Sequence, residues 1–181
     1  MRHNTMITSA GTNIRQLPAI YKLVRWTAGT RNADIGGGKY DELTKALKEV
    51  GVQNVVYDTY NRSREHNETA IALISGGQCH TATVCNVLNA ISEPEARLHV
   101  IRQAADCLVP TGTAYFLIHE GDGSGEGRKT SSGWQENRPA ESYMPEIKKA
   151  FQIVLRRGHL IVAKLPICAN SGWRRRRILF R

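Results

Sequence analysis

Short apolar runs alternate with segments of helical periodicity over the first two thirds of the chain. The expected strands are residues 33–35, 54–58, 81–88 and 113–119, and the expected helices are residues 40–50, 68–75 and 95–108. Strands that alternate with helices are typical of folds in which parallel strands form one sheet between two layers of helices. The pattern therefore predicts an α/β fold with a doubly wound, mainly parallel sheet and helices on both faces.

The two ends of the pattern differ from its middle. Apolar residues recur at helical spacing from Ile14 to Trp26, which predicts an N-terminal helical segment. Near the other end, two β-rich runs, residues 151–155 and 160–165, flank the turn 156–159. This arrangement predicts a C-terminal antiparallel hairpin.

Length and composition favour one domain. The chain has 181 residues, 41% of them hydrophobic, which is too short for two domains of ordinary size. We expect a single domain over residues 1–166. No apolar run approaches the roughly 20 residues of a membrane span, and no signal-peptide core follows the N-terminus, so we expect a cytoplasmic protein. The four cysteines show no C-x-x-C pairing and the histidines do not cluster with them, so we expect buried thiols and no metal site.

Positive charge is concentrated at the C-terminus. The formal net charge is +9, and five arginines fall within the last eight residues. We expect residues 167–181 to form a basic tail. Arg174, Arg175, Arg176 and Arg177 could contact the phosphates of a nucleic acid, and a solvated tail without a partner is the alternative.

Three consecutive glycines follow the first expected strand. Asp34 stands two residues before Gly36, and Gly37 and Gly38 lead toward a helix. Glycines in this place let bare backbone N–H groups approach a ligand. A dinucleotide fingerprint would need a further glycine where Asp41 stands, and Asp34 would repel a pyrophosphate. The stretch therefore predicts a ligand with a cationic end, and a glycine-rich turn without a ligand is the alternative.

An acid at the end of the second expected strand supports a nucleoside ligand. Asp58 lies 20 residues after Gly38. At this spacing a strand–helix–strand unit brings a carboxylate to the edge of the sheet beside the first loop. A carboxylate there can accept hydrogen bonds from both ribose hydroxyls, in nicotinamide and S-adenosylmethionine sites alike. The alternative is an acid that only stabilises the turn after a strand.

Two ordered motifs resemble those of the class I S-adenosylmethionine-dependent methyltransferases. The first is an acidic residue, any residue and Gly-x-Gly, which here reads Asp34-Ile35-Gly36-Gly37-Gly38. The second runs from Asn86-Val87-Leu88 through Glu93-Pro94 and a long helix to Leu108-Val109-Pro110-Thr111-Gly112. The resemblance covers about residues 32 to 118.

The resemblance implies a Rossmann-like methyltransferase fold, S-adenosyl-L-methionine as cofactor and methyl transfer to an unidentified acceptor, a nucleic acid or a small molecule. Asp34 and the three glycines would hold the amino-acid end of the cofactor, and Asp58 its ribose. Asn86 and Val87 would lie near the reacting sulfur, although Asn86 could also brace its loop. The sequence departs from the family in two ways. The segment between Asp58 and Thr81 is too short for the family's usual third strand, and the Asn/Asp-Pro-Pro-aromatic tetrad of adenine-N6 methylation is absent.

The polar segment 120–139 after the strand at 113–119 holds the candidate catalytic residues. Loops of this length are often functional, so a lid over the methyl group is one interpretation and a flexible linker is the other. His119, Glu120 and Asp122 are the candidates, with His119 as a base, and Trp134 is a candidate substrate contact.

Other classes of function stay open. One alternative is a protein that binds S-adenosylmethionine in order to cleave or sense it, because no acceptor site is identified. Another is a nucleic-acid-binding protein that acts through the basic tail. A nicotinamide-dependent dehydrogenase is disfavoured by Asp34 and Asp41.

Overall fold

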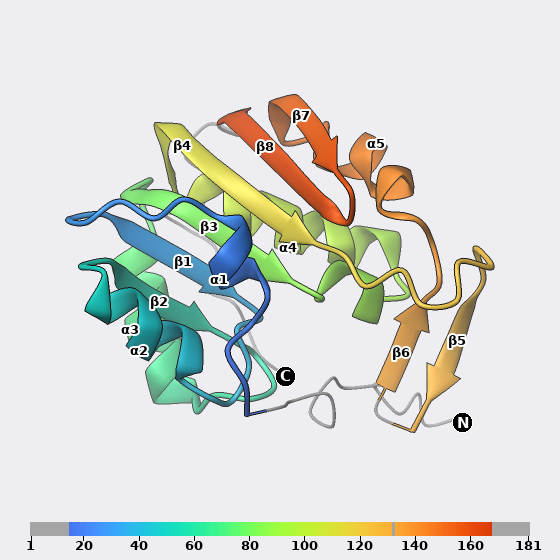
Figure 1. Cartoon of the computed structure of the whole chain (residues 1–181), viewed down its shortest axis with the longest axis horizontal. Coiled ribbons are helices and arrows are strands. Elements are labelled where there is room, and N and C mark those ends of the chain that lie inside the picture. Colours follow the sequence, from blue (N-terminus) through green and yellow to red (C-terminus); the bar gives the residue numbers. More distant parts are fainter. Residues whose placement is uncertain (1–14, 132, 168–181) are drawn as a thin grey trace.

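One six-stranded sheet forms the centre of the molecule (Figure 1). The computed structural model of the chain describes residues 15–131 and 133–167. In the order β2-β1-β3-β4-β8-β7, the strands are β2 (Gln53–Tyr57), β1 (Arg31–Ile35), β3 (Cys79–Cys85), β4 (Leu108–Leu117), β8 (Leu160–Pro166) and β7 (Phe151–Arg157). The first four strands in this order are parallel, whereas β8 runs antiparallel to both of its neighbours. The predicted sheet and its C-terminal antiparallel hairpin are confirmed.

Helices cover both faces of the sheet. One face carries α1 (Ile20–Leu23) and α2 (Glu42–Glu49), and the other carries α3 (Arg64–Ile74), α4 (Pro94–Asp106) and α5 (Met144–Ile147). Two 3-10 turns, η2 (Leu88–Ala90) and η3 (Ala140–Tyr143), lie near α4 and α5. The doubly wound arrangement is therefore confirmed. None of the helices in the described residues combines the length and the apolar character needed to cross a membrane.

The sheet ends at β2, because the chain passes from β2 through α3 directly to β3 on the far side of β1. The predicted lack of a third strand is confirmed. Two side chains of α3 bind the backbone groups that such a strand would meet. His66 Nε2 lies 2.9 Å from the carbonyl oxygen of Val56, and the Asn67 amide bonds both the N–H and the C=O of Asp58 at 3.0 and 2.8 Å. Unpaired groups of an edge strand tend to pair with other chains, and these contacts occupy some of them.

We expect Asn67→Ala to lower the free energy of unfolding by about 2 kcal/mol, because it removes two hydrogen bonds from partly buried backbone groups. Chemical denaturation measures the change. Glu68→Ala on the same helix is the control, since Glu68 forms an exposed pair with Arg64 that contributes little. A loss for Asn67→Ala no larger than that for Glu68→Ala would contradict this account of the sheet edge.

The N-terminal helical segment is shorter than its periodicity predicts. The helix covers four residues, Ile20–Leu23, and Val24 is already extended. The Trp26 indole N–H donates to the carbonyl oxygen of Tyr21 at 2.8 Å, and their rings stack at 6.4 Å. The indole thus satisfies a backbone carbonyl near the end of the helix. Leu17 and Leu23 are 39% and 51% exposed, so part of the apolar periodicity does not correspond to burial.

Two further segments differ from the expectation. The 120–139 segment is not wholly irregular, because β5 (Gly127–Thr130) and β6 (Gly133–Glu136) pair as a separate antiparallel hairpin beside the main sheet (Figure 1). β4 begins at Leu108 rather than at residue 113. Its pairing with β3 shifts register between Cys79 and Thr81, so residues 108–112, expected between a helix and a strand, form an irregular start of the strand.

Candidate functional site

Residues 36–38, the glycine loop, connect β1 to the approach of α2 at the carboxyl edge of the sheet. Gly36 and Gly38 have φ angles of +72° and +77°, a region that favours glycine. The Gly36 N–H donates to the carbonyl oxygen of Tyr57 at 2.7 Å, which fixes the loop against the end of β2. The loop therefore needs glycine for its backbone conformation.

Side chains approach the glycine loop closely from two sides. A Cβ atom on Gly36 would collide with the side chain of Val87, and one on Gly37 would collide with the carboxylate of Asp34. The side chains of Val87 and Asp34 therefore lie next to the backbone of Gly36 and Gly37, where only glycine leaves room for them. The structure thus brings together the acid, the glycines and Val87, which the sequence placed in one site.

Asp34 is a buried acid that pairs with no cation at ion-pair distance within the described residues, although the charge of Arg62 acts on it from farther away. Asp34 is 3% exposed, and Thr83 Oγ1 donates to its Oδ1 at 2.9 Å. Burial raises the pKa of Asp34 to about 6, against the lowering effect of the Thr83 hydrogen bond. Among the described residues, no lysine, arginine or histidine forms an ion pair with it. A bound cation would therefore stabilise the ionised carboxylate.

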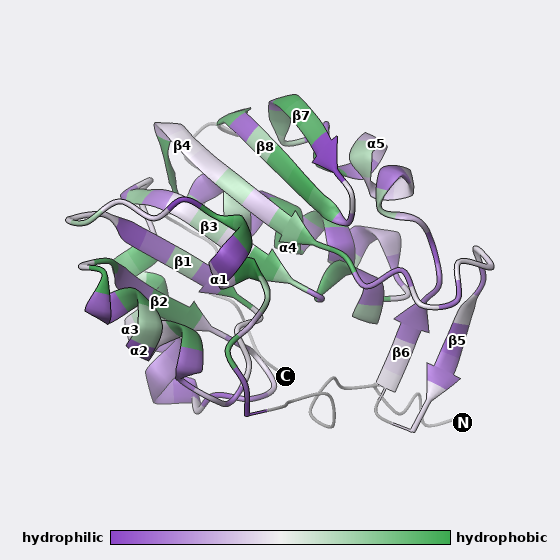
Figure 2. Ribbon diagram, viewed as in Figure 1, coloured by the Kyte–Doolittle hydropathy of each residue, from purple (hydrophilic) through white to green (hydrophobic). Residues whose placement is uncertain are grey.

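A buried polar network continues from Asp34 beneath α2. Asn32 is fully buried, and its amide donates to Asn54 Oδ1 at 2.7 Å and to Thr83 Oγ1 at 3.0 Å. Thr81 Oγ1 donates to Asn32 Oδ1 at 2.8 Å. β1 is accordingly hydrophilic although it is central (Figure 2). Sequence reasoning missed this network, whose signal is the polar residue at every second position of two adjacent strands.

Asp58 braces the glycine loop. Its Oδ2 accepts a hydrogen bond from the Gly38 N–H at 2.9 Å, and its Oδ1 accepts from the N–H groups of Tyr60 and Asn61, both at 2.9 Å, and from Asn61 Nδ2 at 3.1 Å. The 20-residue spacing thus brings this carboxylate beside the loop. Its role toward a ribose stays a prediction.

Arg62 is a site residue that sequence reasoning missed. Its Nε donates to the carbonyl oxygen of Gly38 at 2.7 Å, and its Nη2 donates to the carbonyl oxygen of Tyr40 at 3.2 Å and to Asp41 Oδ1 at 2.7 Å. Asp41, which stands in place of a dinucleotide-type glycine, is therefore a partner of Arg62. An arginine within a polar loop carried no signal for this contact.

Asn86 lies at the end of β3, next to the end of β4. It has a φ angle of +56° and is exposed, and its N–H donates to the carbonyl oxygen of Leu117 at 2.8 Å. Asparagine tolerates this left-handed conformation better than most residues. The following residue, Val87, is the one in contact with Gly36. The place of Asn86 fits a contact to a ligand at this edge, and its predicted role stays a prediction.

The three candidate catalytic residues lie in different surroundings. Glu120 Oε2 is 3.1 Å from His159 Nδ1, and Glu120 Oε1 accepts a hydrogen bond from the Ala140 N–H at 2.6 Å, which is the main cause that lowers the pKa of Glu120. The side chain of His119 is exposed. Asp122 Oδ1 accepts from the Ser124 N–H at 3.0 Å in the approach to the hairpin. Glu120 is thus joined to a histidine that the sequence did not indicate, and Asp122 stabilises a turn.

Asn89 fastens the β5–β6 hairpin to the carboxyl edge. It is buried, its Nδ2 donates to Gln135 Oε1 at 3.2 Å, and its Oδ1 accepts from the His119 N–H at 3.4 Å. Gln135 Nε2 also donates to the carbonyl oxygen of His119 at 3.0 Å. Trp134, the candidate substrate contact, donates its indole N–H to Glu136 at 3.0 Å. The hairpin is therefore held beside the site.

Two predictions remain outside these contacts. Arg174, Arg175, Arg176 and Arg177 lie outside the described residues, and so does the nucleic-acid contact predicted for them. Within residues 15–131 and 133–167, the histidines, cysteines and acids form no group of three or more that could hold a metal ion.

Comparisons with known proteins find likeness in structure and none in sequence. No protein-family model matches the chain, and no curated protein matches it. A Burkholderia thailandensis 1,6-didemethyltoxoflavin-N1-methyltransferase, solved with 1,6-didemethyltoxoflavin and S-adenosylhomocysteine, is similar with a TM-score of 0.57 and 15% identity. The match covers 75% of this chain and 70% of that one.

Two further solved structures are similar over smaller shares of their own length. A Haemonchus contortus phosphoethanolamine N-methyltransferase 2 with bound S-adenosylhomocysteine has a TM-score of 0.52 and 15% identity, over 75% of this chain and 36% of that one. The [4+2]-cyclase SpnF has a TM-score of 0.51 and 16% identity, over 72% of this chain and 54% of that one. The chain thus has the Rossmann-like fold of class I methyltransferases, a fold that also carries other chemistry.

Proposed function

We propose that this chain, which has the class I methyltransferase fold, binds S-adenosylmethionine at the glycine loop and transfers its methyl group to an acceptor. The observation that carries the proposal is the buried carboxylate of Asp34 against Gly37, which forms no ion pair with a lysine, arginine or histidine among the described residues. S-adenosylmethionine has an ammonium group at its amino-acid end. A carboxylate whose pKa is raised by burial is stabilised by such a group.

The residues present fit this cofactor. The glycine loop offers backbone without side chains, and Asp34 supplies a negative charge at its side. Asp58 would receive the ribose beside the Gly38 N–H, which donates to its Oδ2. Val87 offers an apolar surface beside Gly36. A pyrophosphate fits less well, because Asp34 and Asp58 place two carboxylates at the loop.

The protein would act mainly by placing its ligands. When bound, S-adenosylmethionine supplies a methyl group on a sulfonium, which is already electrophilic. Alignment of an acceptor and exclusion of water are then the main tasks of the protein. The β5–β6 hairpin, held by Asn89 and Gln135, is the element placed to limit access of water from one side.

Binding of the methyl donor is expected to weaken as the pH falls. Asp34 has a pKa of about 6, so most of its carboxyl groups in the free protein are protonated at pH 5 and ionised at pH 7.5. Because only the ionised form attracts an ammonium group, the Kd should rise about tenfold between pH 7.5 and pH 5. Calorimetric titration at constant ionic strength measures it. A Kd that stays the same between pH 7.5 and pH 5, or that is lower at pH 5, would contradict the role of Asp34.

Use of the bound cofactor without methyl transfer is a second candidate function, because similar folds carry other reactions. The [4+2]-cyclase SpnF shares the fold, so the fold alone does not determine the reaction. Incubation of the protein with methyl-labelled S-adenosylmethionine and cell fractions separates the two. Label in a macromolecule, or in a small molecule that is not a fragment of the cofactor, supports transfer. Label that stays on the cofactor or on fragments of it supports the second candidate.

A further inference from the structure

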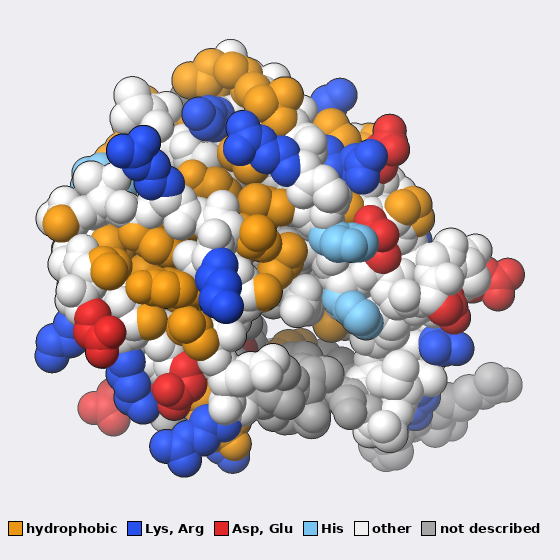
Figure 3. Space-filling view, in the orientation of Figure 1, with side chains coloured by type: hydrophobic (Ala, Val, Ile, Leu, Met, Phe, Trp, Pro, Cys, Tyr) orange, Lys and Arg blue, Asp and Glu red, His pale blue; other side chains and the backbone are white. Residues whose placement is uncertain are grey.

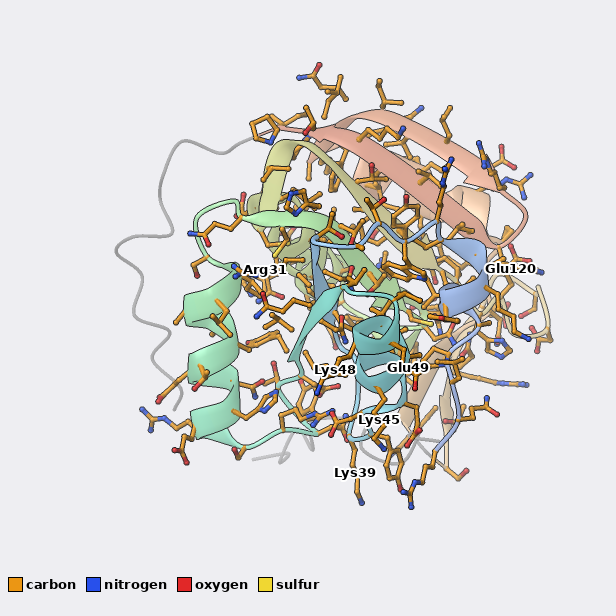
Figure 4. All side chains as sticks on the ribbon, turned by 60° about the vertical axis from the view of Figure 1, so that its left-hand side comes forward. Arg31, Lys39, Lys45, Lys48, Glu49 and Glu120 are labelled. Carbon is orange, nitrogen blue, oxygen red and sulfur yellow. The ribbon has the colours of Figure 1, made fainter. Side chains whose placement is uncertain are left out.

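Glu120 and His159 meet at the carboxyl edge of the sheet, apart from the glycine loop. Glu120 follows β4, and His159 lies in the turn between β7 and β8, after Gly158 with its φ angle of +60°. Figure 4 shows Glu120 at the opposite end of the sheet from Arg31, the first residue of β1. One Glu120 oxygen lies 3.1 Å from His159 Nδ1 and the other accepts from the Ala140 N–H. The carboxylate is thus held at both oxygens and can orient the imidazole.

Backbone hydrogen bonds place this pair two strands from Asn86. The Asn86 N–H donates to the carbonyl oxygen of Leu117 at 2.8 Å, and the Ile118 N–H donates to the carbonyl oxygen of His159 at 3.0 Å. The ends of β3, β4 and β8 therefore lie side by side. Because adjacent strands are about 4.8 Å apart, roughly 10 Å separates the backbones of Asn86 and His159. A molecule with one or two rings spans this distance.

The imidazole of His159 presents a free nitrogen at the surface. The side chain is 66% exposed, and its Nε2 makes no hydrogen bond to any of the described residues. If Nδ1 donates to Glu120, Nε2 is left with a lone pair, and a carboxylate–imidazole pair of this kind holds a base in one tautomer. The nearby charges are Arg156, which donates to the carbonyl oxygen of Gly158 at 3.3 Å, and Glu141, at 3.8 Å from Arg156. Histidine and acidic side chains lie next to each other on this face (Figure 3).

The neighbouring surface is suited to an aromatic molecule. Tyr21 and Trp26 are stacked and partly buried, and they pack against an apolar cluster that includes Leu160, the residue after His159. Aromatic side chains next to a few polar groups are typical of sites for small organic ligands. A base is useful chiefly for a hydroxyl acceptor, because a neutral amine already has a lone pair for attack.

We propose that His159, oriented by Glu120, is the catalytic base of the acceptor site, and that the acceptors are phenols; this rests on the proposed function. His159 Nε2 takes the proton of the phenolic hydroxyl while the oxygen forms a bond to the methyl carbon. The carbon–sulfur bond breaks, and its electron pair stays on the sulfur. The proton remains on the imidazole until it passes to solvent, so the products are a methyl ether, a thioether and one proton.

Methylation of catechol and 4-nitrophenol by the purified protein with S-adenosylmethionine tests the proposal. We expect the wild type to methylate at least one of them. His159→Ala should lower kcat at least about 100-fold and Glu120→Gln about tenfold, while calorimetry shows the donor Kd unchanged within about twofold. His99→Ala, an exposed histidine of α4, is the control and should keep the wild-type rate. A wild type that binds the donor and methylates neither phenol, or His159→Ala at the wild-type rate, would overturn the proposal.

A footprint gives a readout that does not depend on turnover. Diethyl pyrocarbonate acylates a neutral imidazole nitrogen, and mass spectrometry of peptides follows each histidine separately. We expect His159 to react several times faster than His99, and Glu120→Gln to remove the difference. Equal rates in the wild type would overturn the pairing. If the donor itself does not bind, the proposed function fails while the footprint still decides whether Glu120 activates His159.

Discussion

Asp34→Asn is expected to stabilise the free protein at pH 8 while it removes most of the affinity for S-adenosylmethionine. The pKa of Asp34 is raised by burial from 3.8 to about 6. Because the folded state holds this proton more tightly than the unfolded chain, the stabilising contribution is complete below pH 3.8 and is lost as the pH rises through about 6. At pH 8 the cost of the buried carboxylate is about 3 kcal/mol. Asparagine avoids this cost and can still accept the hydrogen bond from Thr83.

Urea denaturation of both proteins over a pH series tests the stability part. The variant should gain up to about 3 kcal/mol in the free energy of unfolding at pH 8, and this gain should shrink as the pH falls toward 4. Titration with the donor should show a Kd at least about 30-fold higher, because an ammonium group would lose its charged partner. A variant that is less stable than wild type at pH 8 would contradict the account of Asp34.

Arg97→Ala is expected to destabilise the protein by about 3–5 kcal/mol, since it leaves a partly buried acid without its main partner. Arg97 is 4% exposed and pairs with Glu146 at 2.8 and 3.1 Å, and it also donates to the carbonyl oxygens of Ile91 and Ser92 at 2.8 and 2.9 Å. Burial alone would raise the pKa of Glu146, but the hydrogen bonds from Arg97 and Arg138 outweigh it and lower the pKa. The pair joins α4 to α5 and to the segment after η2.

Thermal and chemical unfolding of Arg97→Ala measure the loss. Arg102→Ala, an exposed arginine of the same helix, is the matched control and should change stability by less than about 0.5 kcal/mol. The double variant with Arg97→Met and Glu146→Leu removes the buried pair, and it should recover part of the loss, since Arg138 still loses its contact with Glu146. Equal effects of Arg97→Ala and Arg102→Ala would show that the buried pair is not the cause.

The sequence predicts the sheet well because its strands are apolar and its glycines mark the turn after β1. The missing third strand could be predicted from chain length alone, since Asp58 and Thr81 are joined by one helix. The hydrogen bonds of His66 and Asn67 to the backbone at the β2 edge could not be predicted, because they depend on how α3 packs. The length of α1 was overestimated from the sequence, since helical periodicity also occurs in segments whose leucines stay exposed.

The candidate site was predicted in part. Asp34, the glycines, Asp58 and Val87 come together because each ends a strand or follows one at the same edge of the sheet. Residues that reach the site from irregular segments were missed. Arg62 binds backbone carbonyls, which any sequence supplies, and His159 lies in a hairpin turn far along the chain from Glu120. The hairpin β5–β6 lacks apolar alternation, since the β5 residues are all exposed.

Calorimetric titration of the purified protein with S-adenosylmethionine, and with NAD in parallel, tests the central claim most directly. The account predicts micromolar binding of S-adenosylmethionine and none of NAD. Gly37→Ala should abolish this binding, because its Cβ atom would collide with the Asp34 carboxylate. Gly29→Ala should retain it, because the φ of +78° strains an alanine there but a Cβ atom meets no neighbouring group. Absence of S-adenosylmethionine binding by the folded wild type, or unchanged binding by Gly37→Ala, would contradict the assignment of the glycine loop as a methyl-donor site.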